Sequence, residues 1–188
     1  MNHLDEKAVV YDADGVHPTH HSRSADAWIE KGKDFEQPTV SGRDRININA
    51  VINAKNVRDV IAIDSETVNA QSTKELYRKV LERRPQDRKI YVISDNARPY
   101  RNKELTQWLR NTRIEQVFLP PYSPNLNLIE RLWRFLRKKV INTHFYRTKE
   151  LFRNTIHDFF ENIKLYKAEL ETLLTLNCRL VNSLSFSF

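Results

Sequence analysis

The chain has 188 residues, one cysteine and 31 Lys and Arg against 24 Asp and Glu, which gives a formal charge of +7. This length suffices for one domain with a buried core, and the lone Cys178 excludes an internal disulfide and a multi-cysteine zinc site. The apolar runs are too short for a membrane span, so we expect no membrane partner and a location in the cytosol. The basic excess suits a polyanionic partner such as nucleic acid.

Hydrophobic periodicity predicts strands that alternate with helices along most of the chain. We expect strands at 8–13, 46–54, 57–63, 89–94 and 114–119, and helices at 71–84, 102–110, from about 128, and at about 148–163 and 165–176. The Asp14-Gly15 pair and Pro18 indicate a loop directly after the first strand. The alternation predicts an α/β fold with helices on both faces of a sheet, in one domain over 1–176 followed by a tail at 177–188.

The stretch FLPPYSPNLNLIERLWRFLRKK, residues 118–139, places a proline-rich turn directly before an amphipathic helix. Glu130 lies in the first turn of that helix. One interpretation is a capping box, in which Asn127 caps the helix and the Glu130 side chain accepts from the Asn127 N–H. The other interpretation is a functional carboxylate, and this stretch alone favours neither.

Two further acids occupy comparable positions. Asp14 follows the first strand and Asp95 follows the strand at 89–94, and sites in α/β proteins form at strand ends. If those strands are neighbours, they lie about 5 Å apart, and a helix on the sheet can bring Glu130 to the same point. Clustered carboxylates require cations, and oxygen ligands of this type select Mg²⁺ or Mn²⁺. The arrangement indicates phosphoryl transfer with two metal ions.

Three segments of the chain resemble the catalytic blocks of DDE transposases of the mariner-like superfamily, in its bacterial insertion-sequence branch. The segments are DGVHPTH (14–20), SDNARPYRNKELTQWL (94–109) and LPPYSPNLNLIERLW (119–133), and 34 residues separate Asp95 from Glu130, as is typical of that superfamily. The resemblance implies a ribonuclease H-like fold with a mixed central sheet, and Asp14, Asp95 and Glu130 as the metal-binding catalytic triad. It also implies Mg²⁺ or Mn²⁺ as cofactor, double-stranded DNA at transposon ends and target as substrate, TA target sites and a homodimer.

Some residues depart from or compete with this assignment. Leu128 stands where the family commonly has proline. The change removes the fixed backbone angle that proline gives to a helix start, and we expect Glu130 to keep its position. Asp12 competes with Asp14, because residues two apart on a strand point to the same face. We prefer Asp14 for its position before GVHPTH, while Asp64 and Glu66 are weaker rivals.

Other polar residues are candidates for DNA contact. The segment from 131 to 139 has five basic residues and no acid, which suits a phosphate-binding surface or a solvated helix face. The resemblance places His17 in a loop beside the active site, whereas a zinc site at His17, His20 and His21 is less expected. Trp133 is more typical of a core residue than of a base-stacking platform. The DNA-binding candidates are His17, Asn96, Arg98, Arg101, Arg131, Arg134, Arg137 and Lys138.

Family members usually begin with helix-turn-helix modules, and too few residues precede Asp14 to form one. We therefore expect specific recognition of DNA ends to be absent, lost, or supplied by a separate polypeptide or an upstream frame. Two alternatives to a transposase stay open. One is a structure-selective nuclease or resolvase of the same fold, and the other is a catalytically silent DNA-binding fragment that regulates a full-length transposase.

Overall fold

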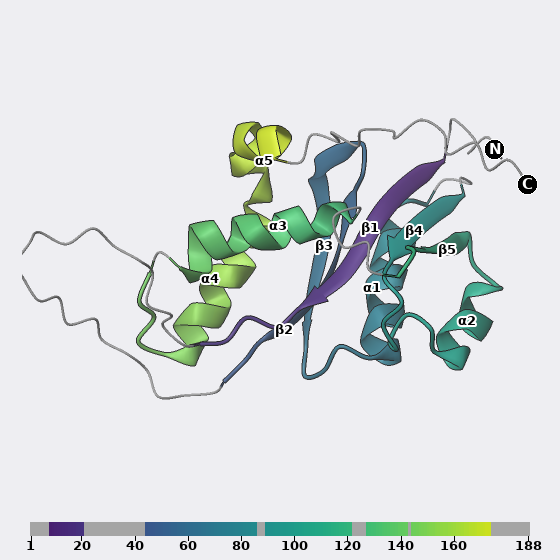
Figure 1. Ribbon diagram of the computed structural model, residues 1–188, viewed down its shortest axis with the longest axis horizontal. Coiled ribbons are helices and arrows are strands. Elements are labelled where there is room, and N and C mark those ends of the chain that lie inside the picture. Colours follow the sequence, from purple (N-terminus) through teal and green to yellow (C-terminus); the bar gives the residue numbers. More distant parts are fainter. Residues whose placement is uncertain (1–7, 21–43, 86–88, 122–126, 143, 174–188) are drawn as a thin grey trace, which may run out of the picture.

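A computed structural model describes residues 8–20, 44–85, 89–121, 127–142 and 144–173 (Figure 1). Its sheet has five strands: β1 Val9–Val16, β2 Asn47–Asn53, β3 Asn56–Ser65, β4 Ile90–Ser94 and β5 Ile114–Phe118. They lie in the order β3-β2-β1-β4-β5. Strand β2 pairs antiparallel with β1 and β3, whereas β4 pairs in parallel with β1 and β5. The expected mixed sheet is confirmed.

Helices cover both faces of the sheet, as expected (Figure 1). One face packs against α1 Ala70–Arg83 and α2 Lys103–Leu109. The other packs against α3 Leu128–Leu136, a π-helical turn η2 Arg137–Ile141, α4 Lys149–Glu161, the 3₁₀ turn η3 Ile163–Tyr166 and α5 Lys167–Leu173. In the described part of the chain, no helix is long and apolar enough to cross a membrane.

Side-chain alternation along β1 decides which residues reach the functional face. Tyr11 and Ala13 belong to the core under α1, whereas Val16 belongs to the core under α3. Because neighbouring strand residues point to opposite faces, Asp12 and Asp14 share the α3 face with Val16. Both candidate aspartates of this strand therefore lie beneath the helix that carries Glu130.

An asparagine caps the start of both α2 and α3, and the cap at Asn127 is the one that the sequence indicated. Asn127 caps α3 by accepting from the Ile129 N–H at 3.3 Å, and Asn102 caps α2. Each cap satisfies an amide that would otherwise lack a partner at the first helical turn. The caps fix where both helices begin, and thereby the height of Glu130 above the sheet.

The first strand is longer than expected, and the predicted loop at Asp14-Gly15 was wrong. Strand β1 continues to Val16 because Asp14, Gly15 and Val16 pair with β2. Gly15 serves packing rather than a turn, since an added Cβ would lie 3.1 Å from a Val68 methyl. The predicted tail at 177–188 and the end of the last predicted helix lie outside the described residues.

Candidate active site

Strand β1 and helix α3 run side by side in the same direction, joined by three hydrogen bonds. At the helix start, the Asn127 amide donates to the Ala13 carbonyl at 3.3 Å, and the Leu128 N–H approaches Asp12 Oδ1 at 3.5 Å. Further along, the Trp133 indole Nε1 donates to Asp14 Oδ2 at 3.0 Å. The strand that carries Asp14 is thus fixed to the helix that carries Glu130.

Asp14 is partly buried, and the charges of both other predicted triad members affect its pKa. Burial raises the pKa of Asp14 to about 7, and the negative charges of Glu130 and Asp95 add to the rise. Hydrogen bonds from the Gly15 N–H and the Trp133 indole oppose it. A carboxyl group that is half ionised near neutral pH, with two acids as neighbours, is well suited to bind a cation.

Asp95 reaches the same place from the neighbouring strand. The parallel ladder pairs Asp12 of β1 with Ile93 of β4, and continuing it by two residues places Asp95 beside Asp14. Asp95 is exposed, and its Oδ1 accepts from the Ala97 N–H at 2.9 Å in a tight turn. The expectation that the strands leading to Asp14 and Asp95 are neighbours is confirmed.

Glu130 is a partly exposed residue in the first turn of α3. Its backbone N–H donates to the Asn127 carbonyl at 3.3 Å. Between these two described residues, the structure records no return bond from the Asn127 N–H to the Glu130 side chain. The capping box is therefore incomplete, and the carboxylate of Glu130 is left for another role.

The three acids fit a divalent metal in ligand type, because their carboxylates are the oxygen ligands that Mg²⁺ and Mn²⁺ prefer. Among the described residues, no three Asp, Glu, His or Cys side chains already converge around one point. Asp14 is held by Trp133, whereas Asp95 is exposed and Glu130 is partly so. Metal binding at this site would therefore require rotation of the Asp95 and Glu130 side chains towards a fixed Asp14.

Asp12 lies deeper than Asp14, under the start of α3. It is 3% exposed, and burial raises its pKa to about 6 against the opposing hydrogen bond from the Leu128 N–H. The charges of Asp95 and Glu130 contribute to the shift of Asp14 and not to that of Asp12. This difference favours Asp14 as the first member of the acidic group.

The weaker acidic rival Asp64 has structural partners. Its carboxylate accepts from Arg153 Nε at 2.5 Å and contacts His157 Nε2 at 2.9 Å, which connects β3 to α4. The Glu66 carbonyl accepts from the Asn47 amide. Asp64 therefore contributes to packing of α4 rather than to the acidic group.

The histidines at 17, 20 and 21, which the sequence offered as a possible zinc site, differ in their surroundings. His17 is exposed, and its Nδ1 lies 2.8 Å from Asn47 Oδ1. His20 is buried, with Nε2 2.8 Å from the Tyr146 carbonyl and its ring 5.5 Å from Phe152. His21 lies outside the described residues. Of the three, His17 is thus the one that the structure places on the functional face.

Asn96 has contacts within the protein at both ends of its amide. Its Nδ2 donates to the Leu119 carbonyl at 2.7 Å, and its Oδ1 accepts from Arg101 Nε at 3.0 Å. The Arg101 guanidinium also stacks over Phe118 at 4.7 Å. These contacts fasten the turn after Asp95 to the end of β5, so that DNA contact by Asn96 and Arg101 stays a prediction.

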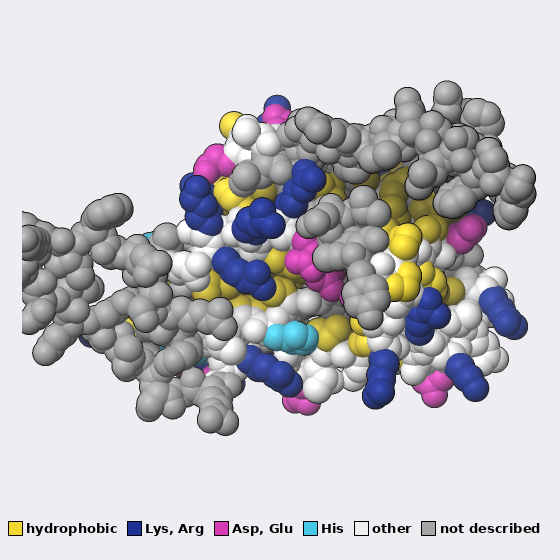
Figure 2. Space-filling view, viewed as in Figure 1, with side chains coloured by type: hydrophobic (Ala, Val, Ile, Leu, Met, Phe, Trp, Pro, Cys, Tyr) yellow, Lys and Arg dark blue, Asp and Glu magenta, His cyan; other side chains and the backbone are white. Residues whose placement is uncertain are grey.

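The basic candidates lie on the surface around the acidic group. Figure 2 shows acidic side chains near the centre of this face, with Lys and Arg side chains over α3 and a histidine nearby. Among the candidates, Arg98, Arg134, Arg137 and Lys138 are exposed, and Arg131 is partly buried. Arg134 and Arg137 follow Glu130 by four and seven positions, so they share its helix face. A DNA strand on that face would meet them directly.

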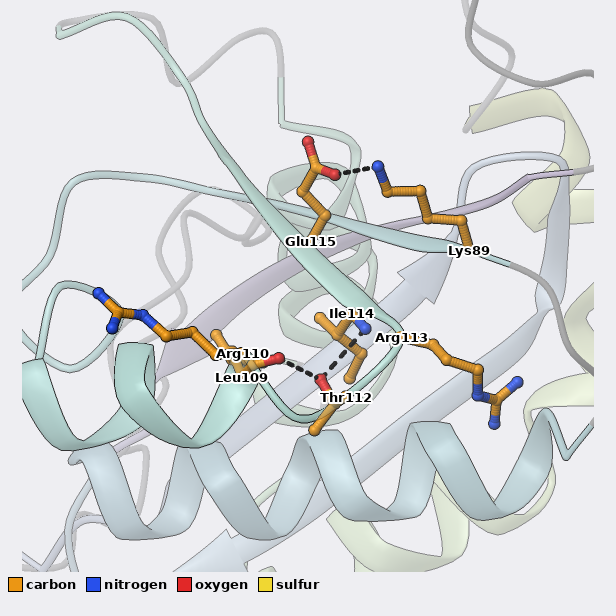
Figure 3. A pocket seen from close by; sticks show the side chains of 7 residues that line it. All are labelled: Lys89, Leu109, Arg110, Thr112, Arg113, Ile114 and Glu115. Atoms are coloured by element: carbon orange, nitrogen blue, oxygen red, sulfur yellow. Dashed lines mark hydrogen bonds and ion pairs between the residues drawn. The ribbon is translucent and has the colours of Figure 1, made fainter.

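A cavity of about 530 Å³ lies away from the acidic group (Figure 3). It adjoins the first residues of β5 and the end of α2, where Lys89 forms an ion pair with Glu115. Asp95 follows the opposite end of β4. Figure 3 shows Arg110 and Arg113 pointing apart, so this cavity presents no convergent polar group.

Two features, one in the site and one on the opposite face of the sheet, were not predicted from sequence. One is the bond from Trp133, which was interpreted as a core residue and is 1% exposed. The other is a buried chain on the α1 face, in which Tyr100 donates to Asn49 at 3.0 Å and Asn49 donates to Thr73 at 3.2 Å. Asparagine inside an apolar strand was the available signal, because a buried amide needs partners.

The fold and the acidic group together define a ribonuclease H-like domain with three carboxylates on neighbouring elements. Residues 8–153 match the family model of the DDE superfamily endonucleases. The chain belongs to this family, in agreement with the resemblance seen in its three motifs.

Individual relatives and solved structures of similar fold agree with this family. The chain is 34% identical over 56 residues to an uncharacterized 39 kDa protein of insertion element IS630 from Shigella sonnei, a match that covers 29% of this chain and 16% of that protein. The Mos1 mariner paired end complex with Mn has a similar fold, with a TM-score of 0.64 at 15% identity, over 88% of this chain and 52% of that one. The catalytic domain of Mos1 mariner transposase gives 0.57 at 15% identity, over 88% and 76%. The chain thus spans about half the length of the Mos1 chain in the complex.

Proposed function

We propose that this chain is the catalytic domain of a DNA transposase that hydrolyses a phosphodiester at a transposon end and transfers the freed 3′-hydroxyl into target DNA. The observation that carries the proposal is the placement of Asp14 on the strand next to the one that leads to Asp95, with the helix that carries Glu130 hydrogen-bonded to Asp14 through Trp133. The neighbours in the comparisons support it, since Mos1 transposase is described in complexes with a transposon end and with Mn or Mg.

In this proposal the acids bind the metal ions and the arginines bind the DNA backbone. Asp14, fixed by the Trp133 indole, is the rigid member, and Asp95 and Glu130 are the members that can rotate. When bound, a pair of Mg²⁺ ions, or Mn²⁺ in their place, would activate the attacking hydroxyl and stabilise the leaving oxygen. Arg134 and Arg137 hold the phosphate backbone in register, because such contacts position DNA without reading its sequence.

The decisive experiment is nicking of a supercoiled plasmid in Mg²⁺ or Mn²⁺. Asp95→Asn and Glu130→Gln should each reduce nicking by at least about 100-fold and change DNA affinity, measured by fluorescence anisotropy, by less than about twofold. Glutamine suits a helix start as well as glutamate does, so lost activity in Glu130→Gln cannot come from lost capping. Glu75→Gln, an exposed change on α1, is the matched control. Normal nicking by Glu130→Gln would refute the assignment.

A duplex with a pre-cut 3′-hydroxyl end and a target plasmid separates the alternatives. A joined product supports a transposase. Nicking without joining favours a nuclease or resolvase of the same fold. DNA binding without metal, unaffected by Asp95→Asn and without any cutting, favours a silent regulatory fragment. Dimer formation and a separate recognition polypeptide are further parts of the proposal, tested by sedimentation with and without DNA.

A further inference from the structure

A second cavity opens next to the acidic group on the same face. It has a volume of about 320 Å³, within the range of sites that bind small ligands. It lies between the residues that follow β1 and the π-helical turn after α3. Its lining includes Val16, His17, Thr19, Arg137, Ile141 and Asn142. π-helical turns occur frequently at functional sites.

The distance from the acids to this cavity follows from two elements independently. His17 lies three residues after Asp14 along extended chain, which is about 10 Å. Arg137 lies seven residues after Glu130 along helix, which is also about 10 Å. Because β1 and α3 run in the same direction, the two estimates reach the same place. One DNA strand rises about 3.4 Å per nucleotide along the helix axis, so a strand that crosses this face brings a phosphate to the cavity within about three nucleotides of the acidic group.

The His17 ring is held in one orientation. The Asn47 Nδ2 donates to the carbonyls of Ser65 and Glu66, so its Oδ1 can only accept. His17 Nδ1, 2.8 Å from that oxygen, must therefore carry the proton. Nε2 is then the ring nitrogen left for a ligand, and in the protonated ring it is a donor.

The charge of the cavity favours an anion. Among its lining residues that the structure describes are the exposed Arg137 and no acid, which disfavours a second cation. Arginine, threonine hydroxyl and asparagine amide are common partners of DNA phosphates. The apolar side chains of Val16 and Ile141 offer a surface for the sugar.

We propose that this cavity binds a backbone phosphate of the DNA strand within about three nucleotides of the phosphodiester that reacts. Arg137 supplies the cation, and the doubly protonated ring of His17 supplies a second donor through Nε2 when the phosphate binds. This inference rests on the proposed function, because that function provides the DNA strand. It adds a defined subsite that fixes the register of the strand.

The first test is metal-free binding of a 16-base-pair duplex of arbitrary sequence, measured by anisotropy across salt concentrations. Arg137→Ala and His17→Ala should each weaken binding about 5- to 20-fold, and Arg137→Ala should reduce the salt slope by about 1. Arg78→Ala removes the same charge from α1 on the opposite face and should change affinity less than about twofold. Because both residues hold one phosphate, the double variant should lose less than the product of the single losses.

Three results bear on the fold and on the alternatives. Arg137→Lys and His17→Gln keep a donor and should recover part of the affinity, which a folding defect would not allow. Independent, multiplying losses would overturn a shared phosphate. A His17→Ala variant with lower Mn²⁺ affinity and unchanged DNA affinity would also overturn it, since Nε2 would then be a metal ligand.

The position is tested after a nick on a duplex has been mapped. Single methylphosphonates, which remove one backbone charge, are placed one to five nucleotides from the cut. One substitution, within about three nucleotides of the cut, should weaken binding by the wild-type chain and not weaken Arg137→Ala further. An equal effect at every position would refute the subsite. The proposed function fails separately, through nicking by Glu130→Gln.

Discussion

The indole of Trp133 donates a hydrogen bond to Asp14 Oδ2 at 3.0 Å, across the interface between α3 and β1. Trp133 lies three residues after Glu130, so the helix that carries one acid also orients another. The ring is 1% exposed and packs edge-on against Phe160 at 6.3 Å. A side chain that belongs to the core thus reaches the site with its one polar atom.

Trp133→Phe should keep most of this packing and remove the bond. We expect Mn²⁺ affinity, measured by calorimetry, to fall about 10-fold or more, as is usual when a group that orients a metal ligand is lost. Stability should fall by only about 1 kcal/mol. Phe160→Leu disturbs the same packing without touching Asp14, and should lower stability while leaving Mn²⁺ affinity intact. Equal Mn²⁺ affinity in Trp133→Phe and wild type would contradict the orienting role.

Metal affinity should depend on pH through Asp14. Its pKa of about 7 is raised above that of a free carboxyl, so below pH 7 the group carries a proton that metal must displace. Mn²⁺ affinity should therefore fall by up to about tenfold per unit as pH drops from 7 to 6, and should level off above about 8. Calorimetry in two buffers of different ionisation enthalpy would also count the released proton. An affinity that is flat from pH 6 to 8 would contradict this assignment.

The network around Asp59 should stabilise the fold in a pH-dependent way. Its carboxylate accepts from Tyr11 at 2.6 Å, from Asn53 at 3.1 Å and from Arg84. Burial raises the pKa of Asp59, but these hydrogen bonds and the Arg84 charge outweigh it, and the net pKa is lowered. A lowered pKa gives stability that is present above the unfolded value of about 3.9 and is lost as pH falls through the folded value.

Asp59→Asn should accordingly lower the free energy of unfolding at pH 7 by about 2 kcal/mol. Urea titrations at pH 7 and at pH 3 would measure it, and the gap between variant and wild type should shrink at pH 3. Asp158→Asn, an exposed change on α4, is the control and should change stability little. A difference in the free energy of unfolding that persists unchanged at pH 3 would show that the charge of Asp59 is not the source of the stabilisation.

The buried chain of Tyr100, Asn49 and Thr73 should matter for stability. Tyr100→Phe leaves the Asn49 oxygen buried without its donor at 3.0 Å, at a cost of about 1 to 3 kcal/mol. Tyr166→Phe removes a hydroxyl from a partly exposed residue and should be nearly neutral. Thermal unfolding of both variants would compare them. Equal melting temperatures would show that the Asn49 amide finds another partner.

Local sequence patterns were sufficient for most of the elements, because helix starts and buried strands depend on neighbouring residues. Asn127 lies directly before α3 and caps it, as the pattern of polar residue and amphipathic run predicts. Local sequence could not predict where β1 ends. Asp14 and Gly15 favour a turn locally, but pairing with Ala50 and Asn49 of β2 extends the strand.

The sequence by itself determined the family and three acids as candidates, since motif residues and their spacing are properties of the chain. Only the tertiary structure favours Asp14 over Asp12, because the depth of each under α3 and the charges beside it depend on how strand, helix and neighbouring strand pack. The same holds for Trp133 and for the partners of His17 and Asn47. Hydrogen bonds between residues 30 or 119 positions apart exist only once the sheet and α3 are assembled.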